Sequence, residues 1–213
     1  MNRDESPMKQ SSQRMEKEHH PAWYYPIQGM ETLILGTFPP YRKNWDFEFY
    51  YPNNQNHFWK VLAKLDGTQL KEIQLQSAVE ERKKLMKRLR VGVQNLGKVI
   101  LRRGTSSADK DIEILEFQDV LGIVNKCPTL KVIHLTGFSD KSSTYRSFIR
   151  YLRQCGREHA LAEKVEAGFQ FSLPGKESVL CTVGNSTSPA ARRAGITFEM
   201  LVEQFREAMR HSR

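Results

Sequence analysis

The sequence predicts an α/β fold, a three-layer α/β/α sandwich around a central, mostly parallel, four-stranded sheet. The prediction rests on short apolar runs that end at or near glycine and on the longer segments of helical periodicity between them. Strands that alternate with helices form a mostly parallel sheet with both faces covered. Because such sheets bind ligands beyond the carboxyl ends of their strands, a functional site is expected in the loops that follow the strands.

The predicted strands are short runs of aliphatic and β-branched residues that stop at turn-forming residues, as the buried strands of a parallel sheet do. The runs that supply the sheet are residues 32–36, 91–96, 130–135 and 178–183. A further run over residues 169–173 precedes the last of them. Between these two lies Pro174-Gly175-Lys176-Glu177, which is a hairpin signature.

Amphipathic segments with helical spacing separate the strands. Over residues 56–65, apolar side chains fall on one face of a helix, and an asparagine just before them can act as the N-cap. The apolar set is Phe58, Leu62 and Leu65, and the candidate N-caps are Asn53, Asn54 and Asn56. Further helices are predicted over residues 77–89, 118–125, 145–152 and 198–209, the last with Thr197 as its N-cap.

Composition predicts one domain that follows a polar tail. Residues 1–21 are polar and lack periodicity, so a disordered tail is expected there, and residues 22–213 form a single α/β domain. No apolar run reaches the roughly 18 residues of a membrane span, and no secretory signal opens the chain. The cysteines are Cys127, Cys155 and Cys181; their wide spacing indicates reduced thiols and a cytoplasmic protein.

The chain is strongly basic, with a net charge of +9 and a pI near 9.5. Such a surplus favours phosphate-rich partners, although basic proteins also use surface charge for solubility alone. Charge therefore indicates nucleic acid without deciding for it.

The loop after the first predicted strand reads Gly36-Thr37-Phe38-Pro39-Pro40. Glycine lets the backbone turn sharply and the prolines fix its path, so this turn can aim backbone N–H groups at a ligand. An ordinary strand-ending turn has the same composition, so the loop by itself does not decide between the two.

A polar loop rich in aromatic and asparagine residues precedes the first predicted helix. A ring on such a loop offers a flat surface for a nucleobase, worth roughly 1–3 kcal/mol per stacked base. Tyr50 and Tyr51 are the candidate stacking rings, whereas Phe58 and Trp59 are expected in the core and His57 at the helix start. Asparagine side chains both donate and accept, as recognition of a base edge requires.

The loop after Gly92-Val93-Gln94-Asn95-Leu96 is charged. Its cations, Lys98, Arg102 and Arg103, suit phosphate contacts. Its carboxylates, Asp109 and Asp111, suit action on water or a cation, although Asp111 is expected only to cap the loop.

The last strand-end loop reads Asn185-Ser186-Thr187-Ser188-Pro189-Ala190-Ala191-Arg192-Arg193. Its small hydroxyl residues and backbone N–H groups suit a phosphate contact. A flexible connector is the alternative interpretation of this loop.

Taken in order, these loops resemble the uracil-DNA glycosylase superfamily, nearest its mismatch-specific uracil/thymine and hypoxanthine (deoxyinosine) branches. Gly36-Thr37-Phe38-Pro39-Pro40 resembles the first motif, and the segment from Tyr51 to Asn56-His57-Phe58-Trp59 resembles the aromatic motif that follows it. Gly92-Val93-Gln94-Asn95-Leu96 is similar to the strand that approaches the flipped base, and Asn185-Ser186-Thr187-Ser188-Pro189-Ala190 to the loop that enters DNA. The resemblance runs from about Met30 to the C-terminus.

The resemblance implies a monofunctional DNA glycosylase of base-excision repair. Such an enzyme acts on a damaged or mismatched duplex, flips a deaminated base such as uracil, hypoxanthine or mismatched thymine into a pocket, and hydrolyses its N-glycosidic bond. It implies no metal and no organic cofactor. We also expect no membrane partner and a monomer that is cytoplasmic and nucleoid-associated when bound to DNA. The implied base-binding residues are Gly36, Thr37, Phe38, Pro39, Tyr50, Tyr51 and Asn95, and the implied DNA-binding residues are Ser186, Thr187, Ser188 and Arg192.

The first motif departs from the family pattern, because Phe38 stands where a polar residue often positions the water. Asn185 is a second departure, where Pro or His is expected. The catalytic candidates are therefore Asp109, as general base or electrostatic group, and Asn56. Two alternatives remain: a catalytically silent, lesion-sensing DNA binder of the same fold, and a metal-dependent nuclease that uses Asp109 and Asp111.

Overall fold

A computed structural model of the chain describes residues 14–72, 75–138, 142–157, 163–165, 168–173 and 176–211. A six-stranded sheet forms its centre, in the order β3-β2-β6-β9-β8-β7. The strands are β2 (Thr32–Gly36), β3 (Val91–Asn95), β6 (Val132–Thr136), β7 (Glu163–Val165), β8 (Gly168–Leu173) and β9 (Lys176–Gly184).

The four parallel strands of this sheet are the four that the sequence predicted. β3, β2, β6 and β9 pair in parallel, and the antiparallel β8 and β7 extend the sheet beyond β9. The antiparallel pairing of β8 with β9 confirms the predicted hairpin, although Pro174 and Gly175 of its turn lie outside the described residues. In the register, Gly36 lies opposite Asn95 and Thr136 opposite Gly184, so the carboxyl ends of the four parallel strands meet at one edge.

A second, antiparallel sheet corrects two predictions. It consists of β1 (Met15–His19), β4 (Gly97–Arg103) and β5 (Ile112–Phe117), in the order β1-β4-β5. The predicted tail over residues 1–21 is therefore wrong for the strand β1, because pairing with β4 satisfies the backbone of this largely polar segment without a run of apolar side chains. Residues 1–13 lie outside the described residues. The predicted charged loop is likewise wrong for β4, whose Val99 and Ile100 are buried.

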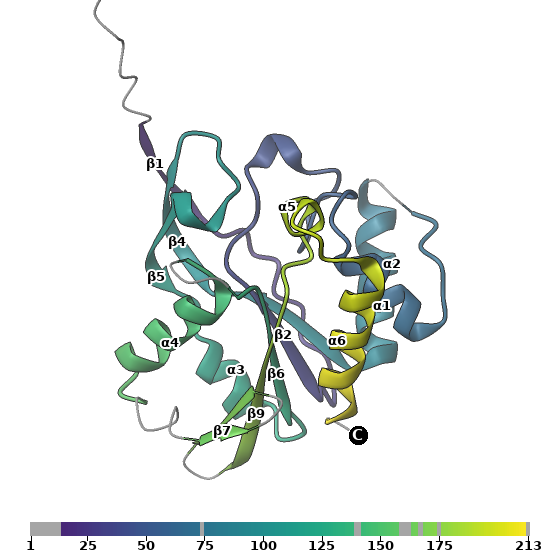
Figure 1. Ribbon diagram of the computed structural model, residues 1–213, viewed down its shortest axis with the longest axis vertical. Coiled ribbons are helices and arrows are strands. Elements are labelled where there is room, and N and C mark those ends of the chain that lie inside the picture. The colour runs from purple at the N-terminus through teal and green to yellow at the C-terminus, as the bar shows by residue number, and fades with distance from the viewer. Residues whose placement is uncertain are drawn as a thin grey trace, which may run out of the picture.

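Helices cover both faces of the central sheet, as Figure 1 shows. The helices α1 (Phe58–Asp66), α2 (Leu75–Leu89) and α6 (Phe198–Arg210) lie on one side, and α3 (Val120–Lys126) and α4 (Thr144–Gln154) on the other. Thr197 caps α6 as predicted, because its side chain accepts from the Met200 amide. Across the described ranges, no helix combines the length and the apolar character that a membrane crossing needs.

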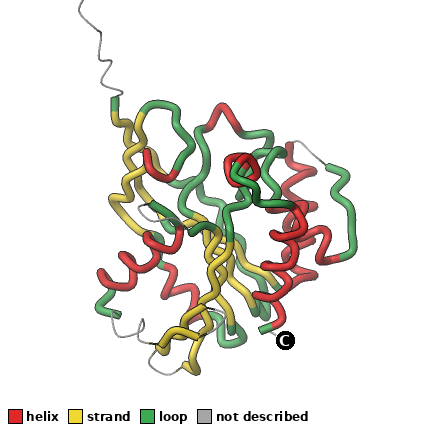
Figure 2. The backbone as a smooth tube through the Cα atoms, viewed as in Figure 1, coloured by secondary structure: helices red, strands yellow, loops and turns green. Residues whose placement is uncertain are grey.

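The core confirms which residues of the aromatic segment are structural. Phe58 is 0% and Trp59 3% exposed, and both pack in the hydrophobic cluster between α1 and the sheet. Beyond the carboxyl edge of the sheet, loops gather around the short helix α5 (Pro189–Arg193) (Figure 2). The site is built from these loops.

Candidate active site

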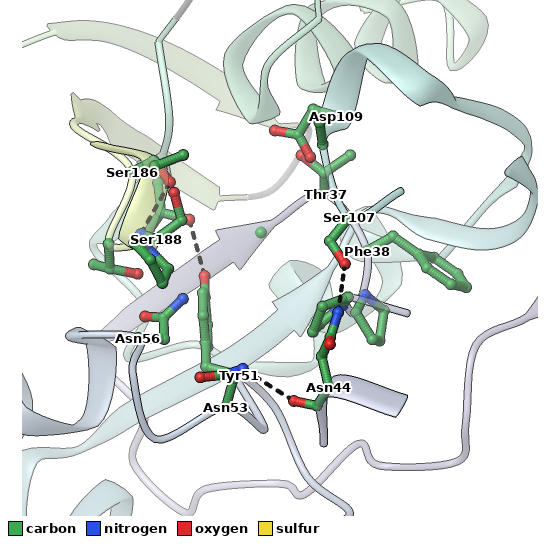
Figure 3. A pocket seen from close by; sticks show the side chains of 18 of the residues that line it. Thr37, Phe38, Asn44, Tyr51, Asn53, Asn56, Ser107, Asp109, Ser186 and Ser188 are labelled. Atoms are coloured by element: carbon green, nitrogen blue, oxygen red, sulfur yellow. Dashed lines mark hydrogen bonds between the residues drawn. The ribbon is translucent and has the colours of Figure 1, made fainter. Parts of the chain in front are cut away.

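A cavity of about 760 Å³ lies beyond the carboxyl ends of β2, β3, β6 and β9 (Figure 3). Its size falls in the range of small-ligand pockets. Most residues predicted to form a site come together here. Those that line the cavity are Gly36, Thr37, Phe38, Pro39, Tyr51, Asn56, Asn95, Asp109, Ser186, Thr187 and Ser188, whereas Tyr50 and Arg192 are not among its lining residues.

The cavity floor depends on the missing side chain of Gly36. A Cβ atom added there would lie 2.6 Å from Asn95 Oδ1 and 2.9 Å from Tyr51 Oη. Both distances are far below an ordinary contact, so only glycine lets these two polar atoms converge over the end of β2.

Tyr51 is held as a rigid wall of the cavity. Its ring stacks on Phe58 with a centroid distance of 3.7 Å and an interplanar angle of 13°. The Thr136 hydroxyl donates to the Leu35 carbonyl, so the Tyr51 hydroxyl donates to Thr136 Oγ1 at 2.8 Å. Burial raises the pKa of Tyr51 above its ordinary value, so the phenol stays protonated. The backbone at Tyr51 is left-handed, with φ 47°, and this turns the ring into the cavity.

Tyr50 does not reach the cavity, and its predicted role in stacking is wrong. The side chain is 0% exposed, and its hydroxyl donates to Gln94 Oε1 at 2.9 Å. The same oxygen accepts from the Asn95 amide at 2.8 Å. Tyr50 therefore supports the end of β3 from the core side.

A buried arginine, Arg102, holds the turn at Gly36–Pro40 against the neighbouring segments. Arg102 was expected to meet phosphate, but it is 0% exposed and pairs with Glu18 of β1 at 2.7 Å. Its guanidinium also donates to the carbonyl of Pro39 at 2.8 Å and to that of Ser106 at 2.6 Å. The arginine thus ties together β1, the turn at Gly36–Pro40 and the loop that carries Asp109. The Phe38 ring packs beside the guanidinium, 5.7 Å from its carbon, so Phe38 borders the cavity without a polar group.

Asp109 begins the short 3-10 helix η2 (Asp109–Asp111) on the cavity wall, next to Thr37 (Figure 3). Ser107 fixes this loop, because its hydroxyl accepts from the Tyr41 amide at 3.0 Å and from Asn44 Nδ2 at 3.2 Å. Burial raises the pKa of Asp109 from 3.8 to about 6, against the opposing effects of a hydrogen bond with Thr37 and the charge of Arg102. A carboxyl group that titrates just below neutral pH in a cleft is suited to proton transfer.

Asp111 is occupied elsewhere. Its carboxylate accepts from the Ser106 hydroxyl at 2.7 Å and lies 3.8 Å from Arg103. In the part of the chain that the structure describes, no three His, Cys, Asp or Glu side chains group as metal ligands. The geometry therefore gives no support to a nuclease site built on Asp109 and Asp111.

Asn56 faces Tyr51 from the start of α1 (Figure 3). Its Oδ1 accepts from the Phe58 amide at 2.9 Å, which leaves the Nδ2 group as the donor for a ligand. The N-cap position of α1 is His57 and its ring makes no capping bond, so none of the asparagines predicted as N-cap holds that position.

The serine-rich loop forms another wall. Ser186 accepts from the Ser188 amide at 3.2 Å, and Ser188 caps α5 by accepting from the Ala191 amide. Thr187 is only 2% exposed and its carbonyl accepts from the His57 amide at 3.0 Å, so it anchors the loop to α1 and is not free to grip a ligand. Arg192 is exposed on α5 outside the lining of the cavity.

Comparisons with known proteins agree with this geometry. No family model matches the sequence. The hypoxanthine DNA glycosylase of Methanosarcina acetivorans is 30% identical over 126 residues, which cover 58% of this chain and 72% of that protein. The hypoxanthine DNA glycosylase of Methanosarcina barkeri is 30% identical over 127 residues, with the same 58% and 72% coverage. A solution NMR structure from Methanosarcina acetivorans, described as a candidate uracil DNA glycosylase, matches with a TM-score of 0.56 and 26% identity, over 89% of this chain and 97% of that one.

The chain belongs to the uracil-DNA glycosylase superfamily. The names of both sequence relatives agree with the resemblance to its hypoxanthine branch.

Within this superfamily fold, Thr136, Thr144 and Ser107 are among the site residues that were not predicted. Thr136 and Thr144 line the cavity, and Thr144 donates to the Thr136 carbonyl at 3.0 Å. Ser107 lines it as well and pins the Asp109 loop. The signal for Thr136 was its place at the end of the third predicted strand, whereas nothing local marked Thr144 or Ser107.

Proposed function

We propose that this protein is a DNA glycosylase that hydrolyses the N-glycosidic bond of a deaminated base flipped out of a damaged or mismatched duplex. The observation that carries the proposal is the Asp109 carboxylate, with its raised pKa, on the wall of a cavity whose other walls are Tyr51, Asn56 and the serine-rich loop. A glycosylase needs such a cavity because its target atom is out of reach inside the duplex.

In this proposal the flipped base lies against Tyr51. One face of the ring is covered by Phe58, and the remaining surface lines the cavity, where stacking is worth roughly 1–3 kcal/mol per base. Asn95 Oδ1 meets an edge of the base over Gly36. The turn after Gly36 contributes its backbone, and the Thr37 carbonyl is already held by the Gly97 amide at 3.0 Å.

Asp109 is the proposed general base that activates the attacking water. The water oxygen attacks C1′ of the deoxyribose while the bond from C1′ to the base nitrogen breaks and the base leaves with the bonding electrons. Ionised Asp109 takes the proton of the water and opposes the positive charge that develops on the sugar. The departing base then takes a proton from solvent. Asn56 also lines the cavity and is the second candidate to hold this water, through its Nδ2 group.

The DNA backbone is gripped by the serine-rich loop and α5. Ser186 and Ser188 line the cavity, Arg193 stands at its rim, and Arg192 is exposed beside it. With the chain's net charge of +9, binding should weaken steeply as salt rises. The protein acts as a monomer in this proposal.

Hypoxanthine is the first base to test, because both sequence relatives are named hypoxanthine DNA glycosylases; uracil and mismatched thymine follow. Phe38 favours the second candidate, a silent lesion-binding protein, since the first motif lacks a polar side chain for water.

The decisive assay uses end-labelled duplexes with one hypoxanthine, uracil, xanthine or mismatched thymine, incubated with EDTA and then treated with alkali. Wild type should give strand cleavage, which Asp109→Asn should abolish and the matched control Asp111→Asn should retain. Tight, lesion-selective binding without cleavage of any substrate would refute the glycosylase and support the silent binder.

A further inference from the structure

His20 follows β1 and lies beneath the cavity floor, in the segment predicted as a tail. Its backbone amide donates to the Lys98 carbonyl at 2.8 Å. Its half-buried imidazole lies among the rings of Trp23, Phe38 and Tyr50, with centroid distances of 5.6, 5.5 and 5.8 Å. The three aromatic neighbours restrict the movement of this ring.

The hydrogen bonds of His20 define its tautomer. Nδ1 lies 2.6 Å from the Pro21 carbonyl, which can only accept, so Nδ1 carries the proton. Burial lowers the pKa of His20 to about 4, so the ring is neutral at pH 7. Nε2 therefore presents a lone pair.

That lone pair orients Asn95. The side-chain amide nitrogen of Asn95 lies 3.0 Å from His20 Nε2, and only the NH₂ group can donate to it. The amide oxygen must then point the other way, to the space over Gly36, where an added Cβ would lie 2.6 Å from it. Gln94 Oε1 holds the Asn95 backbone amide at 2.8 Å, so the residue is fixed at both ends.

We propose that His20 is a positioning residue that locks the Asn95 amide with its oxygen toward the cavity, and thereby selects bases that carry an N–H donor on the facing edge. The inference rests on the proposed function in that a base enters this cavity. Deamination changes that edge: adenine and cytosine have a ring nitrogen with a lone pair there, whereas hypoxanthine and uracil have a ring N–H. An acceptor locked in this place admits the deaminated base and repels its parent.

The test measures binding to two duplexes that resist cleavage. Each carries a 2′-fluoroarabino nucleotide opposite the same base, one with hypoxanthine and one with unsubstituted purine, whose N1 is an acceptor. Wild type should prefer hypoxanthine. His20→Phe keeps an aromatic ring but frees the Asn95 amide to rotate, so the preference should fall by about 5-fold to 10-fold, the worth of one net hydrogen bond. His20→Gln restores an acceptor and should retain most of the preference.

Equal weakening of both duplexes by His20→Phe would show a merely structural role and overturn the inference, as would a wild type without preference. Nitrogen-15 shifts of the wild-type imidazole at pH 7 test it without any variant: a protonated Nδ1 and a bare Nε2 are expected, and the opposite tautomer refutes it. If the wild type prefers hypoxanthine in binding but releases no base in the cleavage assay, the proposed glycosylase activity is refuted and the proposed role of His20 is still supported.

Discussion

Replacing Asp109 with asparagine should stabilise the folded protein at neutral and alkaline pH. The pKa of Asp109 is raised from 3.8 to about 6 by burial, so the folded state holds this proton more tightly than the unfolded chain does. Stability therefore falls as pH rises from about 4 to about 6 and stays reduced above that window. A neutral asparagine of the same shape removes this penalty.

The magnitude follows from the raised pKa. Ionising a carboxyl whose pKa has moved from 3.8 to about 6 costs the folded state at most about 3 kcal/mol, since one pKa unit is worth about 1.4 kcal/mol. Asp109 is only partly buried, which makes this figure a ceiling. For a chain of this length each kcal/mol shifts Tm by about 2–4 °C, so Asp109→Asn should raise Tm by up to about 10 °C at pH 8.

Thermal and urea unfolding at pH 4 and pH 8 would measure the effect. The stabilisation should be present at pH 8 and should be small at pH 4, where the folded state holds the proton and the unfolded chain is about half protonated. Asp111→Asn is the control on the same 3-10 helix, and it should give no gain because it weakens the contacts with Ser106 and Arg103. A Tm for Asp109→Asn at or below that of wild type at pH 8 would refute the view that burial sets the state of Asp109.

Three further changes test the site. Gly36→Ala places a methyl group 2.6 Å from Asn95 Oδ1 and should lower kcat/KM at least about 10-fold while the circular dichroism spectrum is retained; unchanged kinetics would show that the floor is not used. Tyr51→Ala should weaken binding of lesion DNA by about 5-fold to 150-fold through lost stacking, whereas equal affinity for lesion DNA would place the base elsewhere. Arg102→Met leaves Glu18 half-buried and unpaired and should lower the free energy of unfolding by about 3–5 kcal/mol in urea. A change below about 1 kcal/mol would contradict the structural role of Arg102.

The parallel sheet was predictable because buried strands need continuous apolar runs, and each of the four runs stands out in the sequence. β1 gave no such signal. Four of its five residues are polar or charged, and its stability comes from pairing with β4, about 80 residues later in the chain, and from the ion pair of Glu18 with Arg102. The cations of β4 suggested a solvated loop, although one of them is the most deeply buried charge of the site.

Tyr50 and Tyr51 show how far the site itself could be predicted from the sequence. Both are aromatic neighbours on one polar loop, and the sequence does not say which ring enters the cavity. The left-handed backbone at Tyr51 sends that ring to the cavity, and the bond from Tyr50 to Gln94 keeps the other ring in the core. Asp109 was found from the charge pattern of its loop, while the places of Ser107 and Thr144 depend on contacts with the distant residues Tyr41 and Thr37.

The pH dependence of single-turnover base excision, in wild type and in Asp109→Asn, tests the central claim most directly. With a hypoxanthine duplex and excess enzyme, the wild-type rate should rise with pH through a midpoint near 6 and then level, because ionised Asp109 is the active form. Asp109→Asn should be slower by about 10²-fold to 10⁴-fold on the plateau and should lose this transition. A variant that retains the wild-type rate and profile would show that another group handles the water.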